Sequence, residues 1–307
     1  MVLAGVGIAA SKSLHSRARG VDESPDLREV WSCGEGTSKV ARIPIRGVLI
    51  EEGGRGLFDQ PGPVEAALRQ IRAATEDDAV EAIILEIDSP GGSVTASDLL
   101  YKALMDFRKS RDGRQVIALL GDVAASGGYY VAVASDYIIA HPTTLTGSLS
   151  VLISKLNVKQ LGDRYGVKMD TIKSGKNKDL LSPFSELTEE QRALLQSLVD
   201  DMHERFVSLI ANGRGKMTIE DIRRLADGRV FTGARAMELK LVDEVGYWDD
   251  AVERTCKLLG VDSVRVVRYS EPFSLYEVLA GAKAPSFSPR SVLDEVGRVR
   301  MLSLWML

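Results

Sequence analysis

Two short segments of this chain place glycines directly after an apolar run, and both could present backbone amides to a ligand. The first reads EIDSPGGSV over residues 86–94, and the second reads GDVAASGGYY over residues 121–130. Glycine leaves backbone N–H groups unobstructed, and a helix that begins there directs its N-terminus to the same place. Such amides can stabilise an oxyanion, the charged oxygen that forms when a nucleophile attacks a carbonyl. Alone, each segment is weak evidence, because many α/β proteins turn from strand to helix through glycines.

Ser126 stands between two alanines and two glycines in the second segment. It is a candidate nucleophile, because the segment partly matches the nucleophile elbow G-x-S-x-G, with Ala124 in place of the first glycine. The commoner role of a serine that opens a helix is to cap it. The choice between the two roles depends on whether the chain also provides a base.

A histidine and three lysines are the candidate general bases. His141 follows Ser126 by 15 residues at the end of an apolar run, and a Ser–His pair is the less favoured alternative. Lys173, Lys176 and Lys178 cluster in TIKSGKNKDLLSPF. Burial can lower the pKa of a lysine from about 10.4 toward 7–8, which makes it a base near neutral pH. An S-x-x-K arrangement is excluded, since no serine here has a lysine three residues later.

Alternating strands and helices are predicted to hold these segments. Apolar runs predict strands over residues 40–52, 80–90, 115–124, 137–142, 148–153 and 264–270. Helical spacing predicts helices over residues 61–78 and 93–109, from 126 onward, over 188–211, and two short ones within 218–246. Thr188 and Gln191 have capping-box spacing at the start of the longest helix. This pattern is typical of an α/β fold with a largely parallel, covered sheet.

Composition and charge exclude several classes of function. Of the 307 residues, 45% are hydrophobic and 27% are charged, and the formal net charge is −4. A chain of this kind folds but has no basic surface that would bind phosphates, so no nucleic-acid partner is expected. Cys33, Cys256 and the three histidines lack metal-ligand spacing, so we expect neither a metal nor a cofactor.

Both ends of the chain are apolar. The N-terminus has an apolar run of about ten residues followed by Lys12, Arg17 and Arg19, which is half of a bilayer crossing. We expect part of a membrane anchor or an apolar tail there, followed by a linker over residues 11–39. The last segment, VLDEVGRVRMLSLWML, is expected to dock on the chain's own core or on another subunit.

Six segments in one order carry a resemblance to a known family. They are IPIRGVLI, DSPGGSV, DVAASGGYYVAVASD, PTTLTGSLSVL, TIKSGKNKDLLSPFSELTEEQ and ADGRVFTGARAMELKLVDEVG, and they span roughly residues 40–260. Together they resemble the signal peptide peptidase A family, serine proteases of the ClpP/crotonase superfamily. The resemblance implies a ClpP/crotonase-like fold of repeated strand–strand–helix units and no cofactor. The predicted regions are an N-terminal tail or partial anchor with a linker (1–38), a peptidase domain (39–260) and a C-terminal strand with an apolar assembly segment (261–307).

The resemblance also implies roles for individual residues. Ser126 matches the nucleophile, and Lys178, in Ser-Gly-x-x-Lys-Asp, matches the general base. Ser148, in Thr-Gly-Ser, matches the serine that orients the lysine amine. The backbone N–H groups of Gly92 and Gly127 match the oxyanion hole. The residues matched to substrate binding flank the first glycine segment: Gly91, Ser93 and Val94.

Substrate, assembly and location follow from the same resemblance. The expected substrates are cleaved signal peptides and other short apolar or unfolded peptides, bound as an added strand beside residues 91–94. The expected assembly is a homo-oligomer of eight chains, in which the lysine of one chain serves the serine of its neighbour. The N-terminus would attach the protein to the cell membrane, with the peptidase domain outside the cytoplasm.

Two functions of other classes stay open. A crotonase-like acyl-CoA enzyme would use the two glycine amides to bind a thioester carbonyl and would not need Ser126. A catalytically inactive scaffold would act through its oligomer and its apolar tail. A serine-reactive phosphonate distinguishes them, since only the peptidase should be labelled at Ser126.

Overall fold

Eleven strands occur in the part of the chain that the structure describes. The computed structural model describes residues 27–51, 61–215, 217–270 and 302–304. The strands are β1 (Arg28–Cys33), β2 (Ser38–Arg46), β3 (Val80–Ser89), β4 (Gly91–Ser93), β5 (Gln115–Ala125), β6 (Tyr137–Ala140), β7 (Leu145–Gly147), β8 (Val230–Thr232), β9 (Glu244–Val245), β10 (Val264–Ser270) and β11 (Leu302–Leu304). Nine of them form one sheet in the order β1-β10-β2-β3-β5-β6-β9, with β7 beside β5 and β8 beside β7. Most neighbouring pairs are parallel, and only β1/β10 and β7/β8 in this sheet are antiparallel.

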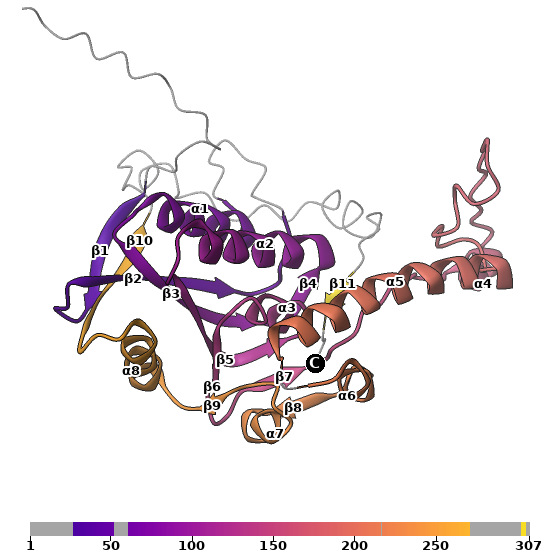
Figure 1. Ribbon diagram of the computed structural model, residues 1–307. Coiled ribbons are helices and arrows are strands. Elements are labelled where there is room, and N and C mark those ends of the chain that lie inside the picture. The colour runs from indigo at the N-terminus through magenta and orange to yellow at the C-terminus, as the bar shows by residue number, and fades with distance from the viewer. Residues whose placement is uncertain (1–26, 52–60, 216, 271–301, 305–307) are drawn as a thin grey trace, which may run out of the picture.

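Helices cover both faces of the sheet (Figure 1). They are α1 (Pro63–Glu76), α2 (Val94–Ser110), α3 (Gly127–Ala132), α4 (Lys159–Tyr165), α5 (Glu189–Gly213), α6 (Ile219–Leu225), α7 (Gly233–Glu238) and α8 (Trp248–Leu259). Side chains of the central strands alternate between two cores: Ile83 and Leu85 belong to the core with α1 and α2, whereas Ala82 and Ile84 belong to the core with α8. Because both faces are buried, the central strands β3 and β5 are mostly apolar.

The predicted α/β fold class is confirmed. The predicted helices over 61–78, 93–109 and 188–211 correspond to α1, α2 and α5, and a helix does begin directly after Ser126. The predicted capping box is present as well: Thr188 accepts the N–H of Gln191 through its side chain, and the Gln191 side chain accepts the N–H of Thr188. The strand predicted over residues 264–270 is β10, which lies inside the main sheet between β1 and β2.

The linker prediction is wrong at residues 28–33, which form β1. This strand pairs antiparallel with β10, with Arg28 opposite Ser270. A partner so distant in the sequence leaves no signal in a local window, and the polar residues around β1 resemble a loop.

The strand prediction over residues 148–153 is also wrong. The strand in this region is β7, which ends at Gly147. Ser148 has a φ of 50°, a conformation outside the β region that turns the chain out of the sheet.

One part of the chain extends away from the rest. We call residues 154–202 the arm, which comprises α4, the loop after it and the outer half of α5; Figure 1 shows it beyond the edge of the sheet and its covering helices. The inner half of α5 packs into the core through Phe206, Val207 and Ile210. The helix therefore joins two regions of very different burial.

The apolar run and the basic residues at the N-terminus lie outside the described residues, as do residues 271–301 of the C-terminal region. In the ranges that are described, no helix combines the length and hydropathy that a bilayer crossing requires.

Candidate active site

The first glycine segment forms the turn from β3 into β4. The Oγ atom of Ser89 accepts a hydrogen bond of 3.1 Å from the N–H of Gly91, and Gly91 has a φ of 98°, which favours glycine. Gly92 has no room for a side chain, because a Cβ there would lie 2.2 Å from the carbonyl oxygen of Leu49. Both glycines are therefore required by the local backbone.

Ser126 lies between β5 and α3 in a backbone conformation that serine rarely adopts. Its φ is 54° and its ψ is −116°, and a non-glycine residue stays there only when the surrounding structure holds it. Its N–H donates to the carbonyl of Gly147 at 2.8 Å, and its carbonyl accepts the N–H of Tyr130 at 2.8 Å. The side chain of Ser126 does not cap α3, so the capping role is not the one it plays. A strained serine at a buried strand-to-helix turn is instead typical of a nucleophile elbow.

The two glycine segments meet at Gly127. A Cβ on Gly127 would lie 2.4 Å from the Oγ of Ser97, 3.1 Å from the Cα of Gly91 and 3.2 Å from the N of Gly92. The backbones of Gly92 and Gly127 are therefore in contact, one residue from Ser126. Two unobstructed amides next to a nucleophile are the arrangement that stabilises a developing oxyanion.

Ser148 leaves the sheet beside Ser126. Strand β7 is parallel to the end of β5, with Gly147 opposite Ala125, so the next residue of each strand is one of the two serines. Ser148 is buried, and its N–H donates to the carbonyl of Arg229 at 2.7 Å. The structure thus brings together the residues matched to the nucleophile, the oxyanion hole and the orienting serine.

Lys178 is not part of this group. It lies in the loop between α4 and α5, and its side chain is exposed. Figure 1 shows this loop at the outer end of the arm, far from α3. Lys173 and Lys176 form ion pairs with carboxylates of the arm. The hydrogen bond from Lys173 lowers the pKa of Asp179, the residue that follows Lys178. A single chain therefore does not bring its own Lys178 to Ser126.

His141, the alternative base, has other partners. Its Nδ1 lies 3.1 Å from the Oγ1 of Thr143, and its ring packs edge-to-face on Tyr247 with centroids 4.7 Å apart. These contacts hold the imidazole between the loop after β6 and the start of α8. They give the Ser–His alternative no support.

A segment near the C-terminus lies against the first glycine segment. Strand β11 pairs antiparallel with β4, with Leu302 opposite Ser93, Ser303 opposite Gly92 and Leu304 opposite Gly91. The backbone of β4 therefore accepts an added strand, here from the chain itself. The apolar C-terminus was expected to dock on the core or on another subunit, and no sequence pattern indicated β4 as the strand with which it pairs.

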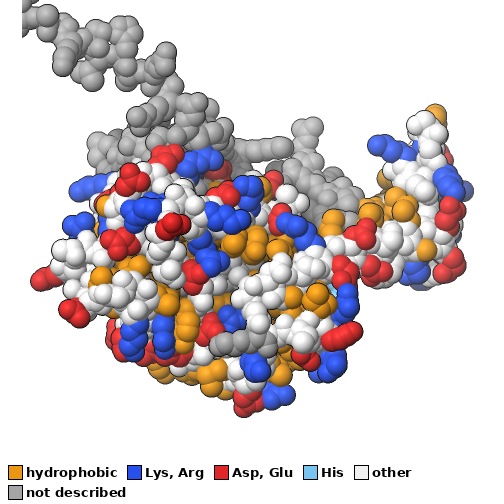
Figure 2. Space-filling view, in the orientation of Figure 1, with side chains coloured by type: hydrophobic (Ala, Val, Ile, Leu, Met, Phe, Trp, Pro, Cys, Tyr) orange, Lys and Arg blue, Asp and Glu red, His pale blue; other side chains and the backbone are white. Residues whose placement is uncertain are grey.

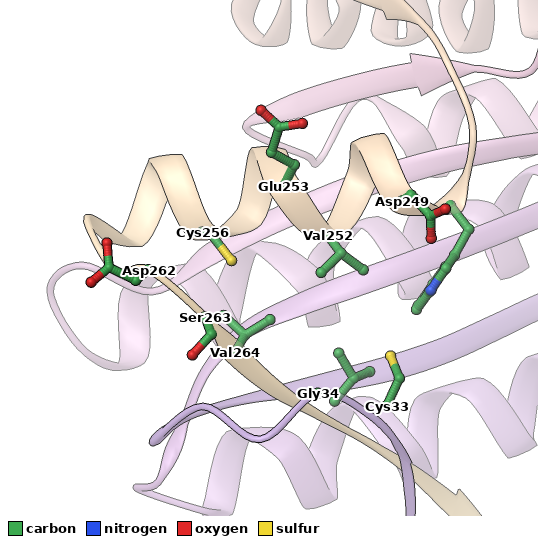
Figure 3. A pocket seen from close by; sticks show the side chains of 11 residues that line it. Cys33, Gly34, Asp249, Val252, Glu253, Cys256, Asp262, Ser263 and Val264 are labelled. Atoms are coloured by element: carbon green, nitrogen blue, oxygen red, sulfur yellow. The ribbon is translucent and has the colours of Figure 1, made fainter.

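A pocket of about 460 Å³ lies elsewhere, between α8 and the ends of β1 and β10 (Figure 3). Val252, Val264 and Trp248 line it together with Cys33 and Cys256. Burial raises the pKa of the Cys256 thiol, which makes it a weaker nucleophile. None of the residues matched to catalysis lines this pocket, and the described ranges contain no cluster of three or more His, Cys, Asp or Glu side chains that could hold a metal ion.

Comparison with known proteins places the chain in a family. The model of peptidase family S49 matches residues 108–262. A protein of Synechocystis sp. named "Putative protease" is 36% identical over 238 residues, which are 77% of this chain and 80% of that protein. The "Putative signal peptide peptidase SppA" of Enterococcus faecium is 35% identical over 237 residues, 77% of this chain and 68% of that protein. "Protease 4" of Salmonella typhi is 36% identical over 239 residues, 77% of this chain and 38% of that protein.

The fold is that of a ClpP/crotonase-like α/β protein, with Ser126 at a strand-to-helix turn of the nucleophile-elbow type. The chain belongs to peptidase family S49, and the names of its relatives support a serine protease.

Proposed function

We propose that this protein is a serine endopeptidase in which Ser126 is the nucleophile and Lys178 of a neighbouring copy is the general base. The observation that carries the proposal is the contact of the Gly92 and Gly127 backbones beside a serine whose φ is 54°. Such a backbone conformation destabilises the folded protein by about 1–3 kcal/mol, and residues strained in this way cluster at functional sites.

The geometry supports a two-step mechanism through an acyl-enzyme. Neutral Lys178 takes the hydroxyl proton as the Oγ of Ser126 attacks the peptide carbonyl, and the amides of Gly92 and Gly127 bind the oxyanion. The C–N bond then breaks, and the ammonium group returns the proton to the leaving amine. The lysine next takes a proton from a water molecule, which attacks the ester carbonyl. The bond to the Ser126 Oγ breaks, the ammonium group returns the proton to that Oγ, and the acyl group leaves as an acid. Ser148 orients the amine throughout.

The surface of the arm supports a base supplied by another copy. Hydrophobic side chains gather along it (Figure 2), and six of them are more than half exposed: Leu156, Leu161, Tyr165, Val167, Met169 and Ile172. An apolar surface of this kind is usually covered by a partner. A second copy that covered the arm would also exclude water from Lys178, and loss of water disfavours the charged form of an amine. Following the family resemblance, we propose a closed ring of eight chains, in which each arm reaches the next Ser126.

The pairing of β11 with β4 supports substrates bound as an added strand. The main chain of β4 would hold an extended peptide of any sequence as it holds β11, and this mode suits unfolded chains. We propose that the substrates are short apolar peptides, including cleaved signal peptides, as the name of the Enterococcus faecium relative indicates for that protein. Attachment to the cell membrane through residues 1–38, with the peptidase domain outside the cytoplasm, is part of the same proposal.

The test is hydrolysis of a fluorogenic apolar peptide across pH 6–10. We expect Ser126→Ala and Lys178→Ala to abolish turnover without loss of assembly, while Lys176→Ala, which alters a lysine two positions away, keeps it. A fluorophosphonate should label Ser126 in the wild type. Activity that survives in Lys178→Ala would assign the base elsewhere, with His141 the first candidate. A wild type that neither turns over peptide nor accepts the phosphonate would favour the acyl-CoA enzyme or the scaffold.

A further inference from the structure

Helix α5 connects the core to the arm, so its direction decides where Lys178 lies. From Arg205 to its first residue, the helix extends roughly 24 Å at 1.5 Å per residue. A tilt of about 3° at the inner half would therefore move the outer end by about 1 Å. A misplacement of about 1 Å caused far from the reacting atoms can lower a rate by ~10²-fold. The contacts that fix the tilt of α5 thus matter for any reaction that uses the arm.

One carboxylate joins α5 to the helix that follows the nucleophile. The Oδ1 atom of Asp98, on α2, accepts a hydrogen bond of 2.6 Å from the hydroxyl of Tyr130. The same atom accepts hydrogen bonds from Arg205 of α5, at 2.5 Å from Nη2 and 3.2 Å from Nε. Tyr130 lies on α3, and its N–H donates to the carbonyl of Ser126. The bonds form a continuous path from the nucleophile to α5.

The ring of Tyr130 reinforces the path by packing. It lies 4.9 Å from the ring of Phe206, the residue after Arg205, and 5.8 Å from the ring of Tyr101 on α2. Burial, followed by the hydrogen bond to Asp98, raises the pKa of the Tyr130 hydroxyl, so this group stays protonated and continues to donate. Three helices are thereby held at one point.

A second contact on the same turn of α5 reaches Leu149, the residue after Ser148. The Nε2 atom of His203 lies 3.2 Å from the carbonyl oxygen of Leu149. His203 thus connects α5 to the loop that follows β7. Arg205 connects α5 to α2 through Asp98, and Asp98 in turn accepts from Tyr130 of α3. The inner half of the helix is fixed relative to both serines of the site.

We propose that Asp98, Tyr130 and Arg205 form a positioning cluster that sets the direction of α5 and so places the arm against the Ser126 of a neighbouring copy. The inference rests on the proposed function, because the cluster acts through Lys178 and touches no reacting atom. The Arg205–Asp98 ion pair is about half exposed, with side-chain exposures of 54% and 35%, and pairs of this kind contribute little to stability. Loss of the pair should therefore affect catalysis more than folding.

Arg205→Gln tests the proposal, with Glu204→Gln as its matched control. Glu204 is the adjacent residue of α5 and pairs with Arg223 of α6 at 2.8 Å, with both side chains about half exposed. We expect Arg205→Gln to lower kcat at least tenfold at unchanged KM, since the strand that binds peptide is intact. Arg205→Lys, which can still donate to Asp98, should restore part of kcat. Glu204→Gln should stay within twofold of wild type.

Three results would overturn the proposal. A kcat for Arg205→Gln within twofold of wild type would remove the positioning role, and so would an equal loss in Glu204→Gln. Lys178→Ala is measured in parallel: if it is inactive while Arg205→Gln is normal, only the positioning cluster fails. If Lys178→Ala is fully active, the cluster and the proposed dyad fail together. If Arg205→Gln does not fold, Tyr130→Phe takes its place, because it keeps the ring and removes the hydroxyl that donates to Asp98. The same changes in kcat are then expected, and the same results would overturn the proposal.

Discussion

The surroundings of Ser126 and those of Lys178 are constructed in opposite ways. Ser126 is 1% exposed and lies on a turn fixed by a close approach of two glycine segments. The loop of Lys178 lies on an arm whose apolar side chains face outward, with Ile172 fully exposed. Folding of one chain is therefore sufficient to form the proposed nucleophile and oxyanion hole, whereas the proposed base would become useful only when another surface covers the arm. In the proposed mechanism, the fold of one chain positions Ser126, and assembly with another copy positions Lys178.

The largest expected effect contrasts a glycine of each region. Gly92→Ala would place a Cβ 2.2 Å from the carbonyl oxygen of Leu49, whereas Gly175, in the arm, has no atom within 4 Å of such a Cβ. We expect Gly92→Ala to lower kcat/KM by ~10²–10³-fold, as the loss of one oxyanion donor does, and to destabilise the fold by about 1–3 kcal/mol. Gly175→Ala should match wild type. Peptide hydrolysis measures kcat/KM and thermal unfolding measures stability in each variant. Equal losses in Gly92→Ala and Gly175→Ala would contradict the expected difference between the two regions.

The next effect concerns the arm. Ile172→Asp would place a charge on the surface that we expect a neighbouring copy to cover, and it should dissociate the oligomer and lower activity by ~10²-fold at low protein concentration. The melting temperature of the chain should not change, because exposed substitutions alter stability by about 0.5 kcal/mol or less. Met237→Asp, at a residue of α7 that is 42% exposed, is the control and should leave assembly intact. Size-exclusion chromatography with light scattering measures the mass of each assembly. An Ile172→Asp protein of unchanged mass would contradict the expected contact between copies.

A smaller effect is expected at the edge of the nucleophile region. Because β11 pairs with β4, it competes with any peptide that binds there, and a tethered segment has an effective concentration in the range of ~mM. A chain that ends at residue 301 should therefore have a KM about three- to tenfold lower for a short peptide. A chain that ends at residue 304 keeps β11 and should behave as wild type. An unchanged KM in the shorter chain would show that β11 does not compete.

The smallest expected effect is on the pH dependence of stability. We expect it for a carboxyl outside the arm and not for one within the arm. Burial alone would raise the pKa of Asp77, but the hydrogen bonds from Lys39 and from the N–H of Ala79 outweigh it and lower the pKa below 3.8. A carboxyl with a lowered folded pKa stabilises the protein above its unfolded pKa and loses that contribution as the pH falls through the folded pKa. Asp77→Asn should therefore lose about 1 kcal/mol at pH 7 and show a flatter acid limb in denaturant unfolding between pH 7 and 3.

Asp179→Asn is the control in the arm. Asp179 also has a lowered pKa, caused first by its hydrogen bond from Lys173, but we expect the arm to unfold separately from the core, so this ion pair should not affect global unfolding. Its unfolding curve should follow the wild type at every pH. A curve that flattens as much as that of Asp77→Asn would mean that the arm unfolds together with the body.

Much of the nucleophile region is predictable because its signals are local. Gly91, Gly92 and the two glycines after Ser126 mark tight turns by residue type alone. The capping box at Thr188 likewise fixes the start of α5 from a spacing of three residues. The strain at Ser126 has no sequence signal, since its φ of 54° depends on the hydrogen bond to Gly147 and on the packing around the turn.

The parts that could not be predicted depend on distant partners. β1 exists because β10 lies beside it. Helix α8, which no prediction covered, does have local signals, since Asp249 and Asp250 lie in its first turn and Gly260 ends it in the left-handed conformation. The separation of Lys178 from Ser126 follows from the direction of α5, which the contacts of Arg205 and His203 determine. No spacing along the chain encodes such a direction.

The most direct test of the central claim is complementation between two inactive variants. Ser126→Ala and Lys178→Ala are refolded together at equal amounts, and mass measurement verifies that mixed assemblies form. If the lysine of one copy serves the serine of the next, about a quarter of the sites in a randomly mixed ring join an intact serine to an intact lysine, and the same share of wild-type activity returns. A verified mixed assembly that stays as inactive as either variant alone would contradict the account.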